Sequence, residues 1–167
     1  MKRSSLTAVA LLALIGTVAL AVPGLSSGGA DGRKVVSGAV LTPVTGPYVG
    51  SANPIRGVAG GGLPWRLASG NVDLRADGRL HVDVEGLVFA AGPNEGTNTV
   101  PAFRAIVSCQ TIQGGAAAVS NVSTDPFPAS PAGDAEIDAT VSLPSPCIAP
   151  IVFVTSPGGA WFAATGV

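Results

Sequence analysis

The sequence predicts an all-β fold, an antiparallel β-sandwich of immunoglobulin-like size, and three observations lead to this prediction. Apolar and polar residues alternate from Leu80 to Glu85, within the stretch Arg79–Phe89, and again over Asp134–Leu143, which is the period of a half-buried strand. The 167 residues include 23 glycines and 14 prolines, which mark turns and disfavour long helices. A hydrophobic content of 47% argues against a disordered chain. A small β-barrel is the alternative that the same pattern allows.

The first 30 residues have the layout of a secretory signal peptide, with an N-terminal signal helix. Lys2 and Arg3 form a short basic start, and the uncharged run Thr7–Val22 follows. Cleavage is expected after Ala21 or after Ala30. The alternative is that the run is retained and anchors a surface protein in a membrane, although its 16 residues are fewer than the roughly 20 that a spanning helix needs. After cleavage, no contact with a membrane is expected.

The part of the chain that follows the signal peptide is expected to form one sandwich domain, residues 54–167, behind a less regular segment. Residues 31–53 contain weak strand material and several prolines and glycines, which predicts a flexible linker or an edge strand. Pro54–Val58 is predicted to form a first short strand. Three successive glycines, Gly60–Gly62, then form a loop that leads to Trp65.

Turn residues separate the other predicted strands. Ala76–Gly78 joins a short strand before it to Arg79–Phe89, so the two form a hairpin. The continuous apolar run Ile148–Thr155 predicts a strand that is covered on both sides. The remaining predicted strands are Phe103–Thr111, Val119–Ser123, Asp134–Leu143 and Ala160–Thr165.

The chain has two cysteines, Cys109 and Cys147, and the export signal predicts an oxidising compartment in which they form a disulfide. The bridge would close a loop of 38 positions, for which the chain-entropy model gives up to about 4 kcal/mol of stabilisation. The alternatives are a redox pair or a metal site. Both are disfavoured, because the spacing is not Cys-x-x-Cys and the one histidine cannot complete a zinc site without carboxylates.

His81 is the only histidine, which excludes multi-histidine metal centres. It shares the outward face of its predicted strand with Asp83 and Glu85, and such a polar row is typical of a solvated surface. One alternative is a cation site built from Asp83 and Glu85, with Glu136 and Asp138 added if the two strands meet. The other is a hydrolase in which His81 acts with a carboxylate. No catalytic residue and no cofactor are assigned.

Two tryptophans are the candidate ligand surface. Trp65 and Trp161 each come shortly after a Gly-Gly pair, and tryptophans carried by loops can form platforms for sugars or peptides. The favoured interpretation is that both are core residues that close the ends of the sandwich.

Nucleic acid is not an expected partner. Removal of the segment that carries Lys2 and Arg3 leaves seven of the nine basic residues against ten acidic ones. The longest basic cluster that remains is Arg33-Lys34, whereas binding to a phosphate backbone depends on several clustered cations.

Five short stretches of the chain carry a resemblance to other proteins. They are Gly61–Trp65, Gly86–Val88, Phe103–Cys109, Pro146–Thr155 and Gly159–Gly166. Through them the segment from Gly60 to Gly166 resembles a group of small secreted proteins of actinobacterial type and unknown function. The resemblance implies export and a compact domain, and it brings no catalytic residues to this chain.

These observations together favour a secreted, bacterial, non-enzymatic β-sandwich. Its expected role is binding or structural, outside the cell or in the envelope, with an extracellular or envelope partner that the sequence does not identify. The alternatives are the hydrolase based on His81 and the membrane-anchored surface protein.

Overall fold

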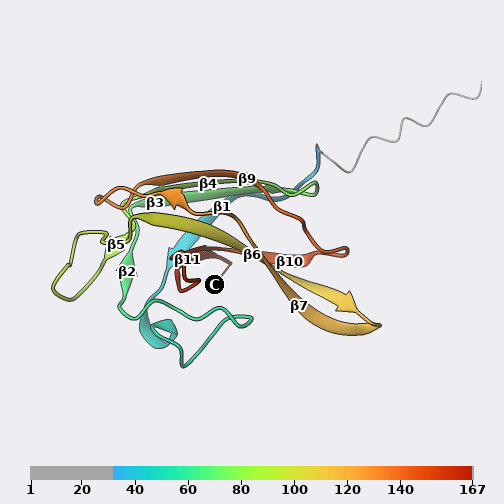
Figure 1. Ribbon diagram of the computed structural model, residues 1–167, viewed down its shortest axis with the longest axis horizontal. Helices are drawn as coiled ribbons and strands as arrows, with labels where there is room; N and C mark the ends of the chain where they lie inside the picture. The colour runs from blue at the N-terminus through green and yellow to red at the C-terminus, as the bar shows by residue number, and fades with distance from the viewer. Residues whose placement is uncertain (1–31, 167) are drawn as a thin grey trace, which may run out of the picture.

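The structure is a computed structural model that describes residues 32–166, and it confirms the predicted all-β fold. One antiparallel sheet runs in the order β7-β6-β10-β11-β1-β3-β4-β9, with β8 beside β6, and a second small sheet pairs β2 with β5. The large sheet is curled, as in a sandwich or a half-barrel (Figure 1). The predicted signal peptide and both predicted cleavage positions lie outside the described residues.

The elements are short and their bounds follow the turns of the chain. They are β1 (Lys34–Pro43), the 3-10 helix η2 (Gly46–Tyr48), β2 (Trp65–Arg66), β3 (Ser69–Arg75), β4 (Arg79–Glu85), β5 (Val88–Phe89), β6 (Ala102–Gln113), β7 (Ala116–Ser123), β8 (Phe127–Pro128), β9 (Ala135–Thr140), β10 (Ile148–Thr155) and β11 (Trp161–Thr165).

Strands β3, β4 and β9 form one layer, and the predicted alternation decides which side chains it buries. The inward residues of β4 are all buried, while the side chains between them are exposed or half-buried. Val82 of β4 pairs with Val72 of β3 and with Ile137 of β9, and all three are 0% exposed. Each such residue contributes about 1.5–3 kcal/mol by leaving water, so this apolar row holds the layer on the core.

Strands β6, β10 and β11 form the second layer, which is covered on both sides. Its inner face packs Phe103 and Val107 of β6 into the core. The loop between β1 and β2 covers the other face: Trp161 donates its backbone N–H to Ala59 O at 2.9 Å, and its ring lies 6.4 Å from that of Tyr48. The last four residues of β10 are buried, as expected for a strand with neighbours above and below, whereas Ile148 at its start is exposed.

Strand β1 connects the two layers. Its first part pairs with β3, and its last part pairs with β11 through Leu41↔Thr165. Two register shifts and a positive φ of 57° at Gly38 let the strand turn from one layer to the other. For residues 31–53 the sequence left a flexible linker and an edge strand open; in the structure Lys34–Pro43 of this segment forms β1, whose first part pairs with β3 and whose last part pairs with β11.

The prediction of a strand at Pro54–Val58 was wrong. Ile55 and Val58 exchange both backbone hydrogen bonds with each other, so the chain reverses between them. Arg56 takes a positive φ of 49° at this reversal. A short apolar segment favours a strand only if a neighbouring strand is present, and here the turn leaves no room for one.

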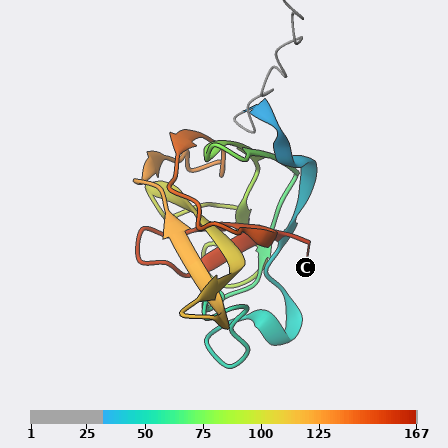
Figure 2. The same cartoon turned by 90° about the vertical axis from the view of Figure 1, so that its right-hand side faces the viewer.

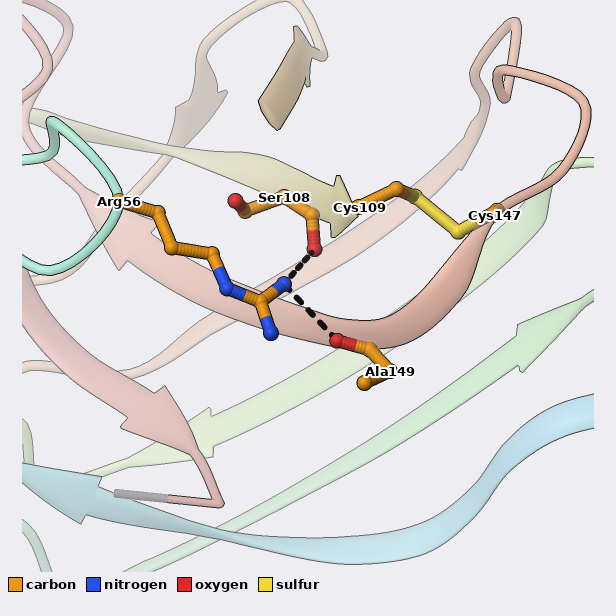
Figure 3. The surroundings of a disulfide bond; sticks show 5 residues. All are labelled: Arg56, Ser108, Cys109, Cys147 and Ala149. Carbon is orange, nitrogen blue, oxygen red and sulfur yellow. Dashed lines mark hydrogen bonds between the residues drawn. A yellow bond between two sulfur atoms is a disulfide. The ribbon is translucent and has the colours of Figure 1, made fainter. Parts of the chain in front are cut away.

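The disulfide between Cys109 and Cys147 is present, with a Cα–Cα distance of 5.0 Å, and it joins β6 to the segment before β10. Arg56 lies beside it and ties the covering loop to both strands (Figure 3). Its Nη1 donates to Ser108 O at 2.9 Å and to Ala149 O at 2.8 Å. The two acceptors are close in sequence to the two cysteines, so the bridge and Arg56 hold the same corner of the fold.

Among residues 32–166 there is no helix of the length and hydrophobicity that crossing a membrane requires.

Candidate functional site

The exposed side of β3, β4 and β9 collects most of the ionisable side chains that the sequence singled out, and we call it the polar face. The pairing register of the three strands sets which side chains lie next to each other across the strands, and each such set is called a row. His81 of β4 lies opposite Asp73 of β3 on one side and Asp138 of β9 on the other. In the next row Asp83 lies opposite Glu136. The strand that carries Asp83 and Glu85 therefore pairs with the strand that carries Glu136 and Asp138. The cation-site alternative in the sequence analysis required this pairing.

His81 and Asp138 form the central contact of the polar face. The His81 Nδ1 lies 2.8 Å from the Asp138 Oδ1, and the two side chains are 44% and 68% exposed. The hydrogen bond to Asp138 raises the pKa of His81 above 6.5, partial burial opposes the shift, and the negative charges of Asp138, Glu136 and Asp83 add to it.

Three donors converge at this point. One ligand atom from each of His81, Glu136 and Asp138 can be chosen so that all lie within 4.8 Å of one another. One nitrogen and two carboxylate oxygens are donors that a divalent transition metal accepts. They stand on two paired strands, so the backbone fixes their spacing.

The predicted pair Asp83 and Glu85 does not form this group. Asp83 lies beside Glu136 in the neighbouring row, whereas Glu85 accepts a hydrogen bond from Ser69 Oγ at 2.9 Å. Both carboxylates that join His81 come from the neighbouring strand β9: Asp138 lies directly opposite His81, and Glu136 lies opposite Asp83.

A basic rim borders the donors on the side of β1. Lys34 donates to Asp73 Oδ1 at 2.9 Å, and the Gly38 backbone N–H donates to the same oxygen at 3.1 Å. These bonds, the lysine first, lower the pKa of Asp73 below 3.8. The shallow depression between this rim and the side chains of His81 and Asp138 has a volume of about 620 Å³, and Arg75, Arg79 and Thr140 also line it.

The depression bears on the hydrolase hypothesis. A histidine with a carboxylate on one nitrogen is an acid–base pair, and a nucleophile would have to stand beside the other nitrogen. The described residues that line the depression include Thr140 but neither a serine nor a cysteine.

Both tryptophans lie in the core, each 1% exposed. The Trp65 ring stacks on Phe162 with centroids 4.0 Å apart and contacts Phe89 at 4.3 Å. The Trp161 ring lies 5.9 Å from Phe153. Neither indole is available as a platform in this structure, so the candidate ligand surface is not at the tryptophans.

The register of β4 against β9 is the part of the site that sequence reasoning missed. The acidic residues of both strands were visible in the sequence, and the alternation placed them on the outward face of each strand. The charge pattern gave a weak signal, since His81 is a cation when protonated and Asp138 provides a complementary cross-strand partner.

Comparisons with known proteins give no relative for this chain. No protein-family model matches it, and neither a curated protein nor a solved structure is significantly similar to it.

Proposed function

We propose that this chain is an exported, non-enzymatic binding domain that acts outside the cell or in the envelope, and that it binds its ligand on the polar face. The basic and apolar start of the sequence supports export. The disulfide supports an oxidising compartment. The exposed row of ionisable groups on a rigid sheet supports a binding role.

The observation that carries the proposal is the convergence of His81, Glu136 and Asp138. We propose a divalent transition metal of the Zn²⁺ class as the ligand, since an imidazole and two carboxylates suit such an ion. Three protein donors leave a coordination position open, through which a water or a group of a partner molecule would complete the site.

Isothermal titration of the metal-free, disulfide-intact domain with Zn²⁺ and separately with Ca²⁺ tests the ligand. One equivalent of Zn²⁺ is expected to bind, and His81→Ala and Asp138→Asn are each expected to weaken binding at least about tenfold. Asp73→Asn is the matched control, because it removes a carboxylate from the same row without removing a donor. Equal losses in all three variants, or no Zn²⁺ binding by the parent domain, would refute the site.

A second candidate function is the hydrolase, and the hydrogen bond between His81 and Asp138 is the observation in its favour. Purified protein would be assayed with generic ester and amide substrates, and any activity would be compared with that of His81→Ala and Asp138→Asn. Activity that both variants abolish would favour the enzyme over the binding domain. Activity that survives both variants would come from elsewhere.

Export and anchoring are tested by the intact mass of the protein recovered from culture medium and from membranes. A species in the medium that is cut after Ala21 or Ala30 supports the exported domain. The uncut chain found only in membranes would replace it with the anchored surface protein.

A further inference from the structure

Strand β7 ends the large sheet and pairs on one side alone. All eight of its residues, Ala116 to Ser123, are in register with β6, and no described strand lies along its other side. Every position is exposed or half-buried. The tip of its hairpin with β6 extends beyond the two layers on the right of Figure 1 and therefore faces the viewer in Figure 2. One row of backbone N–H and C=O groups therefore faces solvent.

The sequence does not protect this edge. From Gln110 to Thr124 there is no charged residue and no proline, the two devices that commonly block pairing at an edge strand. The opposite end of the sheet differs, because β9 carries Glu136 and Asp138 on its exposed face. The short hairpin loop at Gly114-Gly115 is also free of charge, so the whole tip can approach another sheet without desolvating an ion.

Apolar side chains gather along the same hairpin. Ile112 is 57% exposed, Val119 is 46% exposed, and Ile148 of the neighbouring strand β10 is 50% exposed. They line a shallow depression of about 440 Å³ together with Ala117 and Ala118. An edge that offers both unpaired backbone groups and apolar side chains can gain hydrogen bonds and hydrophobic contact in one association.

We propose that β7 pairs antiparallel with β7 of a second copy of this chain, so that the sheets of two copies join into one. A two-fold axis makes the contact self-complementary, with each copy supplying the same groups that it receives. The neutrality of the strand fits this occupant. A charged edge would oppose its own copy with like charges, and β7 presents none. Alanines at 116–118 let the two backbones approach closely.

The dimer is independent of the metal site, because the polar face lies on β3, β4 and β9.

The test is sedimentation velocity on the disulfide-intact domain over a series of concentrations. Val119→Lys places a charge near the middle of the edge, where the two-fold axis would bring it close to the same charge of the second copy. Val40→Lys is the matched control, since Val40 is 71% exposed on β1, away from the hairpin.

The parent domain and Val40→Lys are expected to dimerise, and Val119→Lys is expected to raise the dimer dissociation constant at least about tenfold. Tryptophan fluorescence of each variant checks that the core is intact. Amide hydrogen exchange locates the contact, with the backbone of β7 expected to become protected as concentration rises. A parent domain that stays monomeric throughout, or a dimer in which β7 exchanges as fast as in the monomer, would overturn the proposal.

Discussion

Replacing both Cys109 and Cys147 with alanine removes the covalent link between β6 and the start of β10. The perturbation is well defined, because the structure joins these two residues and leaves no free cysteine among those it describes. Cys109 is 0% exposed, so its replacement also deletes a buried sulfur atom from the core. Reduction of the parent protein breaks the same bond and keeps that atom, which separates the two effects.

The magnitude follows from the loop that the bond closes. The cysteines are 38 positions apart, and the chain-entropy model converts a loop of that length into about 4 kcal/mol of lost stability at 25 °C. Native strain and residual structure in the unfolded chain lower the measured figure. With a urea dependence of about 1.5 kcal/mol per molar, the unfolding midpoint is expected to fall by about 2–3 M.

Urea unfolding followed by tryptophan fluorescence is the assay, since both tryptophans are buried and become exposed on unfolding. The reduced parent protein and the double alanine variant are each expected to show the lower midpoint, with the variant somewhat lower because of the missing sulfur atoms. If reduction moves the midpoint by less than about 0.5 M, the bond adds little stability and the reasoning from loop length fails.

Three further predictions concern single side chains. Gly133→Ala is expected to cost about 2 kcal/mol or more in unfolding free energy, because Gly133 has a φ of 87° and a Cβ there would lie 2.3 Å from Leu87 O. Trp65→Phe is expected to cost less than Trp65→Ala, which should lose about 3–5 kcal/mol in the same urea assay, since the Trp65 Nε1 has no hydrogen-bond partner to lose. In a proton NMR titration without metal, His81 is expected to titrate above 6.5, and Asp138→Asn should lower the midpoint towards that value. The contribution of the His81–Asp138 pair to stability is thus present below 6.5 and is lost as pH rises through the pKa of the folded protein.

The predictions for Gly133 and His81 each have a matched control. Gly159→Ala tests backbone strain alone, because Gly159 has a φ of 93° and open space where a Cβ would lie, so it should cost less than Gly133→Ala. Equal costs at the two glycines would show that the close approach to Leu87 is relieved cheaply. Asp73→Asn, on the other side of His81, should leave the histidine midpoint closer to that of the parent than Asp138→Asn does. A midpoint that ignores Asp138 would contradict the hydrogen bond.

The sequence predicted the elements whose side chains alternate, because the pattern itself states which face is buried. β4 and β9 follow it residue by residue. It did not predict which strands are neighbours: β4 and β9 pair although the 49 residues 86–134 lie between them, and β1 changes partner midway. Register of this kind depends on how the whole core packs, and local alternation carries no information about it.

For the candidate site, too, the sequence predicted one feature and missed another. The outward position of His81 followed from the alternation, but its contact with Asp138 depends on a register between distant strands. The burial of Trp65 and Trp161 is a similar case, since the glycines before them fit both a surface loop and a core plug. The rings of Phe89 and Phe162, which decide the matter for Trp65, come from strands that the sequence does not place beside it.

The position of β11 in the sheet limits when the fold can form. Although β11 is the last strand in chain order, it lies between β10 and β1, with both of its sides paired. A growing polypeptide that has produced every earlier strand still presents two open edges with a gap between them. The large sheet can therefore be completed only after the residues of β11 have been added. Until then the edges of β10 and β1 that β11 will cover keep unpaired backbone groups, which can pair with other chains.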